Sequence, residues 1–196
     1  MAKKTAPWQP DALEAVRCLK SGGVMLHATD TVWGLAASAK DGEAIRRVNR
    51  IKGRPEDQPL IVLVASDGDM ERLLPGLPDA AWDLIESSDR PVTVLAEPGT
   101  QHGLDESLIG PDGRVAVRWV RNDPYTEFVI RGAGRLASTS ANFNGAATPE
   151  KFAGIPESLR SAVDHVASHR REELSAAPPS MMVAFDAEGR FEMLRS

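Results

Sequence analysis

Two cations stand where a predicted helix gives way to a loop. Lys52 and Arg54 are separated by Gly53 and followed by Pro55. A lysine supplies a point charge and an arginine supplies a planar fork of donors, and together they suit a polyphosphate. The competing interpretation is that both cations stabilise the negative end of the helix dipole. Because a Lys-x-Arg triplet is common, the spacing alone favours this second interpretation.

A run of small polar side chains follows a short apolar stretch further along the chain. Residues 138–142 read Ser-Thr-Ser-Ala-Asn, so that most of these side chains carry a hydroxyl or an amide. In an open α/β sheet, ligands bind beyond the ends of strands, where such groups offer neutral donors and acceptors. An Asx or Ser/Thr turn explains the same composition. The pattern alone leaves both interpretations open.

Two further features place polar groups beside apolar runs. Residues 29–34, Thr-Asp-Thr-Val-Trp-Gly, suit either the floor of a pocket or an ordinary turn. Arg118 interrupts the apolar run 115–120, and alternation places its side chain on one face with Ala116 and Val120. A cation on an apolar strand needs an anionic partner. That partner is either an acidic side chain of the core or the carboxylate of a substrate.

Other kinds of chemistry find no support in the sequence. The histidines have no metal-ligand spacing, and no Walker, Rossmann or nucleophile-elbow motif occurs. With one Tyr and five Phe, the chain has no aromatic platform for stacking bases. The formal net charge of -5 gives no sign of tight duplex binding, although a local basic cleft is compatible with it. Cys18 is the single cysteine, so an intramolecular disulfide is excluded.

Length and hydropathy predict a soluble, cytoplasmic protein that does not contact a membrane. The 196 residues fit one domain of ordinary size, over 1–196. The first residues lack the pattern of a signal peptide, and no segment reaches the ~20 apolar residues that a membrane-spanning helix needs.

Helix and strand patterns alternate with short links, which predicts an α/β domain with a mixed sheet. Helix patterns occupy 11–20, a segment capped by Asp41 that runs to Ile51, 70–74, 79–87, a segment capped by Asp123 that ends at Gly132, and 156–163. Strand patterns occupy 24–26, 35–39, 60–65, 91–96, 115–120, a short stretch from Leu136, 165–167, 181–185 and 191–194. Loops are predicted at 98–113 and 175–180, and the turn of a final hairpin at 186–189.

In their order along the chain, these segments resemble the motifs of the YrdC/TsaC family, the threonylcarbamoyl-AMP synthases. The family's P-T-[DE]-T-x-[YW]-G-L motif resembles residues 28–35, and its K-x-R-P and P-L-I-V motifs resemble residues 52–55 and 59–62. The family's V-x-V-R strand resembles residues 115–118, and its S-x-N motif followed by S-G resembles residues 140–142 with 144–145. Its terminal P-S-[ST] and its late Arg resemble residues 179–180 and Arg195. Each motif is weak alone, but the ordered set is specific.

The resemblance implies a twisted sheet of parallel and antiparallel strands, flanked by helices and forming a concave, basic cleft. It implies a reaction of L-threonine, bicarbonate and ATP that gives threonylcarbamoyl-AMP and pyrophosphate. Mg²⁺ is expected to enter with ATP, held by phosphates and water rather than by a protein cage. The implied transient partners are tRNA and the tRNA-threonylcarbamoyl transferase proteins, which place the product's acyl group on an adenosine beside the anticodon.

The resemblance also implies roles for individual residues. Lys52 and Arg54 correspond to the catalytic cations that hold the triphosphate and stabilise charge moving onto pyrophosphate. The other implied ATP-binding residues are Gln58, Ser140, Asn142, Thr148, Ser180 and Arg195. The implied threonine-binding residues are Thr31, Arg118 and Ser138. No side chain is implied to ligate a metal directly.

Two departures from the family pattern bear on the substrate. Leu63 stands where some members have a histidine near threonine, and Met181 stands where many have a threonine after the terminal serine. These departures leave open the alternative that the protein is a relative that forms a different carbamoyl- or acyl-adenylate. A second alternative is an RNA-binding module that uses the same cleft without catalysis. The net charge and the scarcity of aromatic residues count against that module as the main role.

Overall fold

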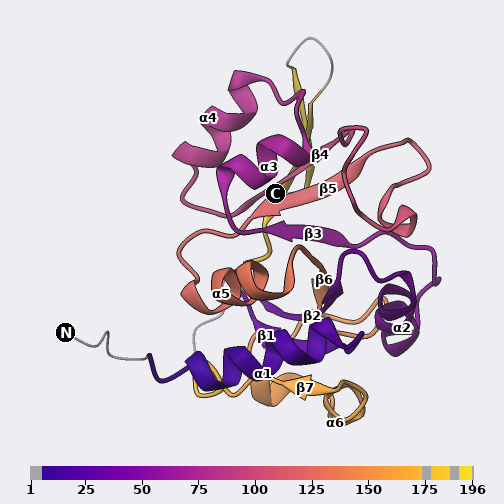
Figure 1. Cartoon of the computed structure of the whole chain (residues 1–196), viewed down its shortest axis with the longest axis vertical. Coiled ribbons are helices and arrows are strands. Elements are labelled where there is room, and N and C mark those ends of the chain that lie inside the picture. Colours follow the sequence, from indigo (N-terminus) through magenta and orange to yellow (C-terminus); the bar gives the residue numbers. More distant parts are fainter. Residues whose placement is uncertain (1–5, 174–177, 186–189, 196) are drawn as a thin grey trace.

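The computed structural model describes residues 6–173, 178–185 and 190–195, whose strands form one twisted sheet (Figure 1). The strands are β1 Met25–Ala28, β2 Trp33–Ser38, β3 Ile61–Val64, β4 Val92–Ala96, β5 Val115–Trp119, β6 Leu136–Ser140, β7 His165–Val166, β8 Met181–Phe185 and β9 Phe191–Arg195. Within the described residues the strand order is β7-β1-β2-β6-β3-β5-β4-β8-β9.

Parallel and antiparallel pairs occur in the same sheet, which confirms the predicted mixed sheet. β1, β2, β6 and β3 pair antiparallel in succession, and β4 pairs antiparallel with β5. The parallel pairs are β1–β7, β3–β5 and β4–β8. β8 and β9 pair antiparallel as the predicted final hairpin requires, while its expected turn at 186–189 and part of the expected loop at 175–180 lie outside the described residues.

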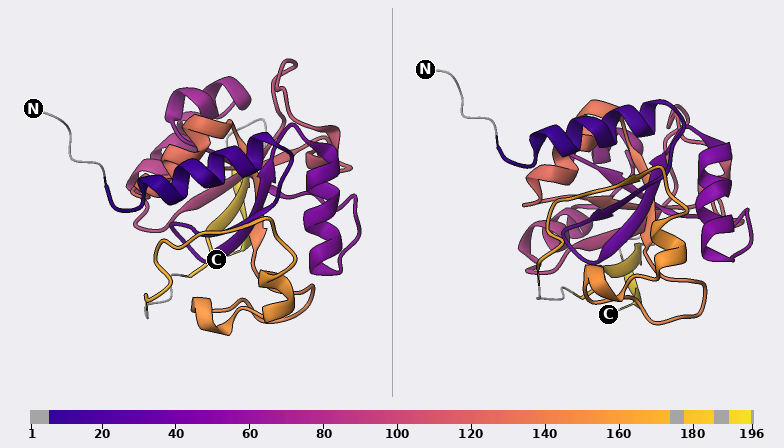
Figure 2. Two further views of the ribbon diagram at one scale, coloured as in Figure 1. Left: turned by 60° about the horizontal axis from the view of Figure 1, so that its bottom comes forward. Right: turned by 90° about the horizontal axis from the view of Figure 1, so that it is seen from below.

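Helices cover the sheet and bury its alternating apolar side chains. The helices are α1 Gln9–Lys20, α2 Gly42–Lys52, α3 Asp67–Leu73, α4 Asp79–Ser87, α5 Pro124–Ala133 and α6 Glu157–Arg160, with 3-10 turns at Glu106–Leu108 and Phe152–Gly154. Met25 and Leu63 share one apolar cluster with α1 and α5, whereas their neighbours Leu26 and Val62 join a second cluster with α2, α3 and α4. Figure 2 shows α1 and the segment 141–160 on opposite sides of the sheet.

The structure corrects the bounds of several predicted elements, such as the helix expected at 70–74, which begins at Asp67. Two of the corrections follow from strand pairing. The helix expected at 156–163 is shorter, because the backbone N–H of Asp164 donates to the carbonyl of Val24 and thereby starts the β7–β1 pairing. The second strand begins earlier than expected, at Trp33, because Trp33 and Gly34 pair across the hairpin with β1. Among the described residues, no helix is both long and apolar enough to cross a membrane.

Gly53 ends α2 with a left-handed backbone, at a φ of 66°, and turns the chain between Lys52 and Arg54. A Cβ on Gly53 would meet no atom within 4 Å, so that only the backbone conformation opposes a larger residue. We expect Gly53→Ala to lower the free energy of unfolding by about 1 kcal/mol, measured by urea denaturation. Gly76→Ala is the matched control, since Gly76 has equally open surroundings and no left-handed φ. An equal loss in both variants would contradict this interpretation.

Candidate active site

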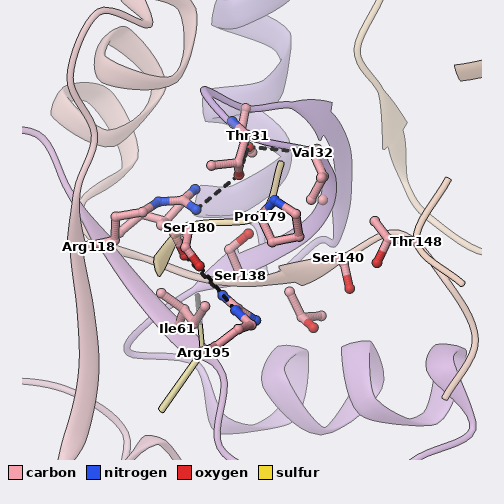
Figure 3. Close-up of a pocket in the computed structure, with 14 residues that line it drawn as sticks. Thr31, Val32, Ile61, Arg118, Ser138, Ser140, Thr148, Pro179, Ser180 and Arg195 are labelled. Carbon is pink, nitrogen blue, oxygen red and sulfur yellow. Dashed lines mark hydrogen bonds between the residues drawn. The ribbon is translucent and has the colours of Figure 1, made fainter. Parts of the chain in front are cut away.

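A cavity lies at the end of β6, beside the loop that joins β1 to β2 and the start of β8 (Figure 3). Hydroxyl groups dominate its polar wall, and two guanidinium groups join them. The lining residues are Thr29, Thr31, Val32, Gly34, Ile61, Leu63, Arg118, Ser138, Thr139, Ser140, Thr148, Pro179, Ser180 and Arg195. Arg118 and Thr31 lie at one end of the cavity, and Ser140 and Thr148 lie at the other (Figure 3).

The antiparallel register of β2 and β6 brings the two polar segments of the sequence together. Gly34, at the start of β2, is paired with Ser140, at the end of β6. The loop 29–32 therefore faces the segment 138–140 across the cavity. Gly34 permits this approach, because a Cβ there would lie 3.1 Å from both the Ser138 hydroxyl and the Thr139 carbonyl. The segment 29–34 thus forms both a turn and the wall of a pocket.

Arg118 has an acidic partner in the protein, which is the first of the two partners that the sequence left open. Its Nη2 lies 3.0 Å from Oδ1 of Asp30, and both side chains are more than nine-tenths buried. Its Nη1 donates to the hydroxyl of Thr31 at 3.0 Å. Burial raises the pKa of the Asp30 carboxyl above its ordinary value, although the nearby Arg118 acts in the opposite direction. The Nε atom of Arg118 is buried without a hydrogen-bond partner.

Ser180 and Arg195 close another side of the cavity. The Arg195 guanidinium donates to the carbonyl of Ser180 at 3.1 Å and to its hydroxyl at 3.0 Å. Burial lowers the pKa of Arg195 below its ordinary value, and the positive charges of Arg118 and Arg90 lower it further. Arg118 and Arg195 are thus two cations that stand close together on this side of the cavity, an arrangement that suits an anionic ligand.

Lys52 and Arg54 lie behind the cavity wall and not in it. The Lys52 ammonium donates to the carbonyl oxygens of Ser140 and Asn142, which joins the end of α2 to the end of β6. Burial, and secondarily Arg54, lowers the pKa of Lys52 to about 8. Arg54 donates to the carbonyl of Pro59 at 3.0 Å and approaches the Thr139 hydroxyl at 3.5 Å. Both cations thus stand against the segment 138–142, rather than capping α2 alone.

The segment 138–142 is also a turn, so that both interpretations of its composition hold. The Asn142 amide donates to the carbonyls of Phe143 and Ala146, and its Oδ1 accepts from the Ser140 hydroxyl. Ser138 is buried, while Ser140 is half-buried and faces the cavity. These bonds hold the backbone so that β6 ends at the cavity.

The structure brings most of the predicted site residues to one place. Those that line the cavity are Thr31, Arg118, Ser138, Ser140, Thr148, Ser180 and Arg195. Those that do not line it are Lys52, Arg54, Gln58 and Asn142. Gln58 is exposed on the loop after α2. The cavity has two guanidinium groups and no carboxylate among its described lining residues, and the basic cleft stays a prediction.

Some residues of the site were not singled out by the sequence patterns. Ile61 lines the cavity, yet an apolar residue at a strand start carries no signal that separates it from the core. Asp30 lies within a predicted pocket segment, but its pairing with Arg118 depends on a contact between distant parts of the chain. No cluster of three or more His, Cys, Asp or Glu side chains suited to a metal ion occurs in the described part of the chain.

Comparisons with known proteins agree with this fold and its motifs. The family model Sua5_yciO_yrdC, described as "Telomere recombination", matches residues 17–196. The chain is similar to the threonylcarbamoyl-AMP synthase of Pseudomonas aeruginosa (strain UCBPP-PA14), with 35% identity over 65% of this chain and 68% of that protein. It is similar to the Bacillus subtilis threonylcarbamoyl-AMP synthase, with 30% identity over 76% of this chain, and spans only 43% of that relative's length.

Solved structures share the architecture. E. coli YciO has a TM-score of 0.82 and 17% identity, over 97% of this chain and 91% of that one. P. abyssi Sua5, complexed with L-threonine, has a TM-score of 0.75 and 23% identity, over 93% of this chain and 52% of that one. At these identities the likeness shows the fold, a mixed sheet with flanking helices. With the match of the family model over most of the sequence, it follows that the chain belongs to the Sua5/YciO/YrdC family.

Proposed function

We propose that this protein is an L-threonylcarbamoyladenylate synthase. The observation that carries the proposal is the cavity, in which the guanidinium of Arg118 and the hydroxyl of Thr31 stand together at one end. These two groups suit the carboxylate and the amine of an amino acid. The relatives named threonylcarbamoyl-AMP synthase and the P. abyssi Sua5 complexed with L-threonine support threonine as that amino acid.

The reaction joins two anions, so it depends on positive charge and on positioning. The amine of threonine and bicarbonate give a carbamate with loss of water. A carbamate oxygen then forms a bond to the α-phosphorus of ATP, and the bond from that phosphorus to the bridging oxygen breaks to release pyrophosphate. Chemistry of this kind needs preorganised cations and donors rather than a covalent nucleophile. Arg118, Thr31 and Ser138 hold threonine in this proposal.

The nucleotide occupies the other end of the cavity. Lys52 and Arg54 place positive charge behind the segment 138–142. The triphosphate would lie on the other side of this segment, in the cavity. The other ATP-binding residues of the proposal are Gln58, Ser140, Asn142, Thr148, Ser180 and Arg195. Mg²⁺ fits this end, because phosphate oxygens and water supply its preferred ligands and the hydroxyls of Ser140 and Thr148 add neutral oxygen donors. The ion would neutralise charge on the phosphates.

The product is a reactive mixed anhydride and must be passed on. We propose that tRNA-threonylcarbamoyl transferase proteins consume it to modify tRNA, as transient partners in the cytoplasm. The loop 29–32, Ser180 and Arg195 line the cavity, and in this proposal they limit the access of water to such an anhydride.

One assay tests the proposed function. Pyrophosphate release is measured from ATP with Mg²⁺ and bicarbonate, with and without L-threonine, and the adenylate is identified by mass spectrometry. We expect pyrophosphate that depends on threonine and a mass of threonylcarbamoyl-AMP. Turnover with another amino acid instead would support a different adenylate, for which Met181 and Leu63 are the residues to examine. Steeply salt-dependent tRNA binding without turnover would support an RNA-binding module.

The ammonium of Lys52 predicts an alkaline limb in the pH profile. Since the pKa of Lys52 is lowered to about 8, its positive charge is present below that pH and is lost above it. We expect kcat/KM for ATP to fall by about tenfold per pH unit above pH 8, at saturating threonine and bicarbonate. The measurement is the rate of pyrophosphate release from about pH 6.5 to 9.5. Lys52→Met should remove this limb, and an unchanged limb in that variant would assign it to another group.

A further inference from the structure

The hydroxyls of Thr29 and Thr31 form a buried chain of hydrogen bonds at the threonine end of the cavity. Thr29 Oγ1 lies 2.9 Å from Thr31 Oγ1 and 2.8 Å from the carbonyl oxygen of Val32. The backbone N–H of Thr31 also donates to Thr29 Oγ1, at 3.1 Å. At the other end of this hydrogen-bonded chain, Arg118 donates to Thr31 Oγ1. The two threonines are 3% and 6% exposed.

The two ends of this chain determine the direction of every bond in it. A carbonyl oxygen only accepts, so Thr29 must give its single hydroxyl proton to Val32. Thr29 Oγ1 can then only accept from Thr31, and the Thr31 proton is committed to Thr29. A guanidinium only donates, so Arg118 fills one lone pair of Thr31 Oγ1. Thr31 is left with one lone pair and no free proton.

We propose that Thr29 is a positioning residue that presents Thr31 to the substrate as a hydrogen-bond acceptor only. The group of the substrate beside Thr31 must therefore be a donor, an N–H or an O–H. This inference rests on the proposed function and deepens it, because it sets the orientation of the amino acid and makes Thr29 a determinant of specificity. A carboxylate, which only accepts, is repelled from Thr31 and directed to Arg118.

The donor is the α-amino group. Thr31 Oγ1 lies 3.0 Å from Nη1 of Arg118, and a carboxylate that binds Arg118 from the cavity side would bring its α-carbon close to Thr31. The first donor on that carbon is the α-nitrogen, whereas the side-chain hydroxyl of threonine is one carbon further away. Asp30 supports this arrangement from the protein side, since its carboxylate pairs with Nη2 and keeps the guanidinium against Thr31.

The experiment compares two ligands that differ only at the α-nitrogen. L-threonine and (R)-3-hydroxybutanoate share the carboxylate and the hydroxyl, and only threonine has the amino group. Their dissociation constants are measured by calorimetry on the full chain, with and without Mg²⁺-ATP, in buffer freed of bicarbonate so that no turnover occurs. The proteins are the wild type, Thr29→Val, which has the same shape without the hydroxyl, and Thr29→Ser, which keeps the hydroxyl.

We expect Thr29→Val to weaken threonine binding by about tenfold and to leave 3-hydroxybutanoate binding within about twofold. The Thr29→Ser variant should retain the preference of the wild type for threonine. Equal weakening of both ligands would show that Thr29 has a structural role only and would overturn the proposal. A wild type that binds both ligands equally would overturn it too, since the amine would then go unrecognised.

Thermal unfolding establishes that each variant is folded, and Thr29→Ala replaces Thr29→Val if the latter is not. The binding ratio does not require turnover, whereas the proposed function is judged by pyrophosphate release. A wild type that prefers threonine in binding but makes no threonylcarbamoyl-AMP would therefore contradict the proposed reaction and leave the assignment of Thr29 supported.

Discussion

Lys52→Met is expected to lower the rate of threonine-dependent pyrophosphate release by a factor of about 10² to 10³. The buried ammonium places a positive charge behind Ser140 and Asn142, at the end of the cavity proposed for the triphosphate. Negative charge moves onto the leaving pyrophosphate in the transition state, so a cation held in place lowers the barrier. Methionine has a similar length and removes both the charge and the hydrogen bonds to Ser140 and Asn142.

The control for this prediction is Lys20→Met. Lys20 is exposed at the end of α1 and does not line the cavity. The same substitution there removes a positive charge that lies away from the proposed site. We expect its rate to stay within about twofold of the wild type. Thermal unfolding of Lys52→Met separates a loss of catalysis from a loss of folded protein. A folded Lys52→Met with the rate of the wild type would exclude Lys52 from the reaction.

Arg118→Leu is expected to lower the free energy of unfolding by about 3–5 kcal/mol. The substitution leaves the Asp30 carboxylate buried without its counter-ion, and the protein must then either hold an unpaired charge or protonate it. For a chain of this size, we expect the thermal midpoint to fall by about 10 °C. Threonine binding should be lost as well, because the proposed partner of its carboxylate is gone.

A double variant separates the ion pair from other effects of the substitution. Asp30→Asn combined with Arg118→Leu removes both charges, and we expect it to recover most of the stability lost in Arg118→Leu. Arg114→Leu is the matched control, since Arg114 precedes β5 and pairs with Asp112 in an exposed setting. We expect Arg114→Leu to lower the free energy of unfolding by less than about 1 kcal/mol. Additive losses from Asp30→Asn and Arg118→Leu would contradict a coupled buried pair.

Elements with local signals were predictable from the sequence. Asp41 caps α2 by accepting from the backbone N–H of Ala44, and Asp123 caps α5 by accepting from Thr126. α4 runs from Asp79 to Ser87, as its pattern predicts. The physical reason is that caps, helical periodicity and left-handed glycines act within a few residues. The helix α6 was predicted too long because the residues that follow α6 pair with β1, a strand that is distant in the sequence.

The candidate site likewise has properties that local motifs predict and properties that only the tertiary structure sets. Residue types and motif order determined the family, the mixed sheet and which segments carry polar groups, because each motif is a short stretch of sequence. Only the tertiary structure decided that Arg118 pairs with Asp30, that Lys52 stands behind the cavity wall, and that the Thr31 hydroxyl lies between Thr29 and Arg118. These properties follow from strand register and from contacts between residues that are far apart in the chain, which no local pattern encodes.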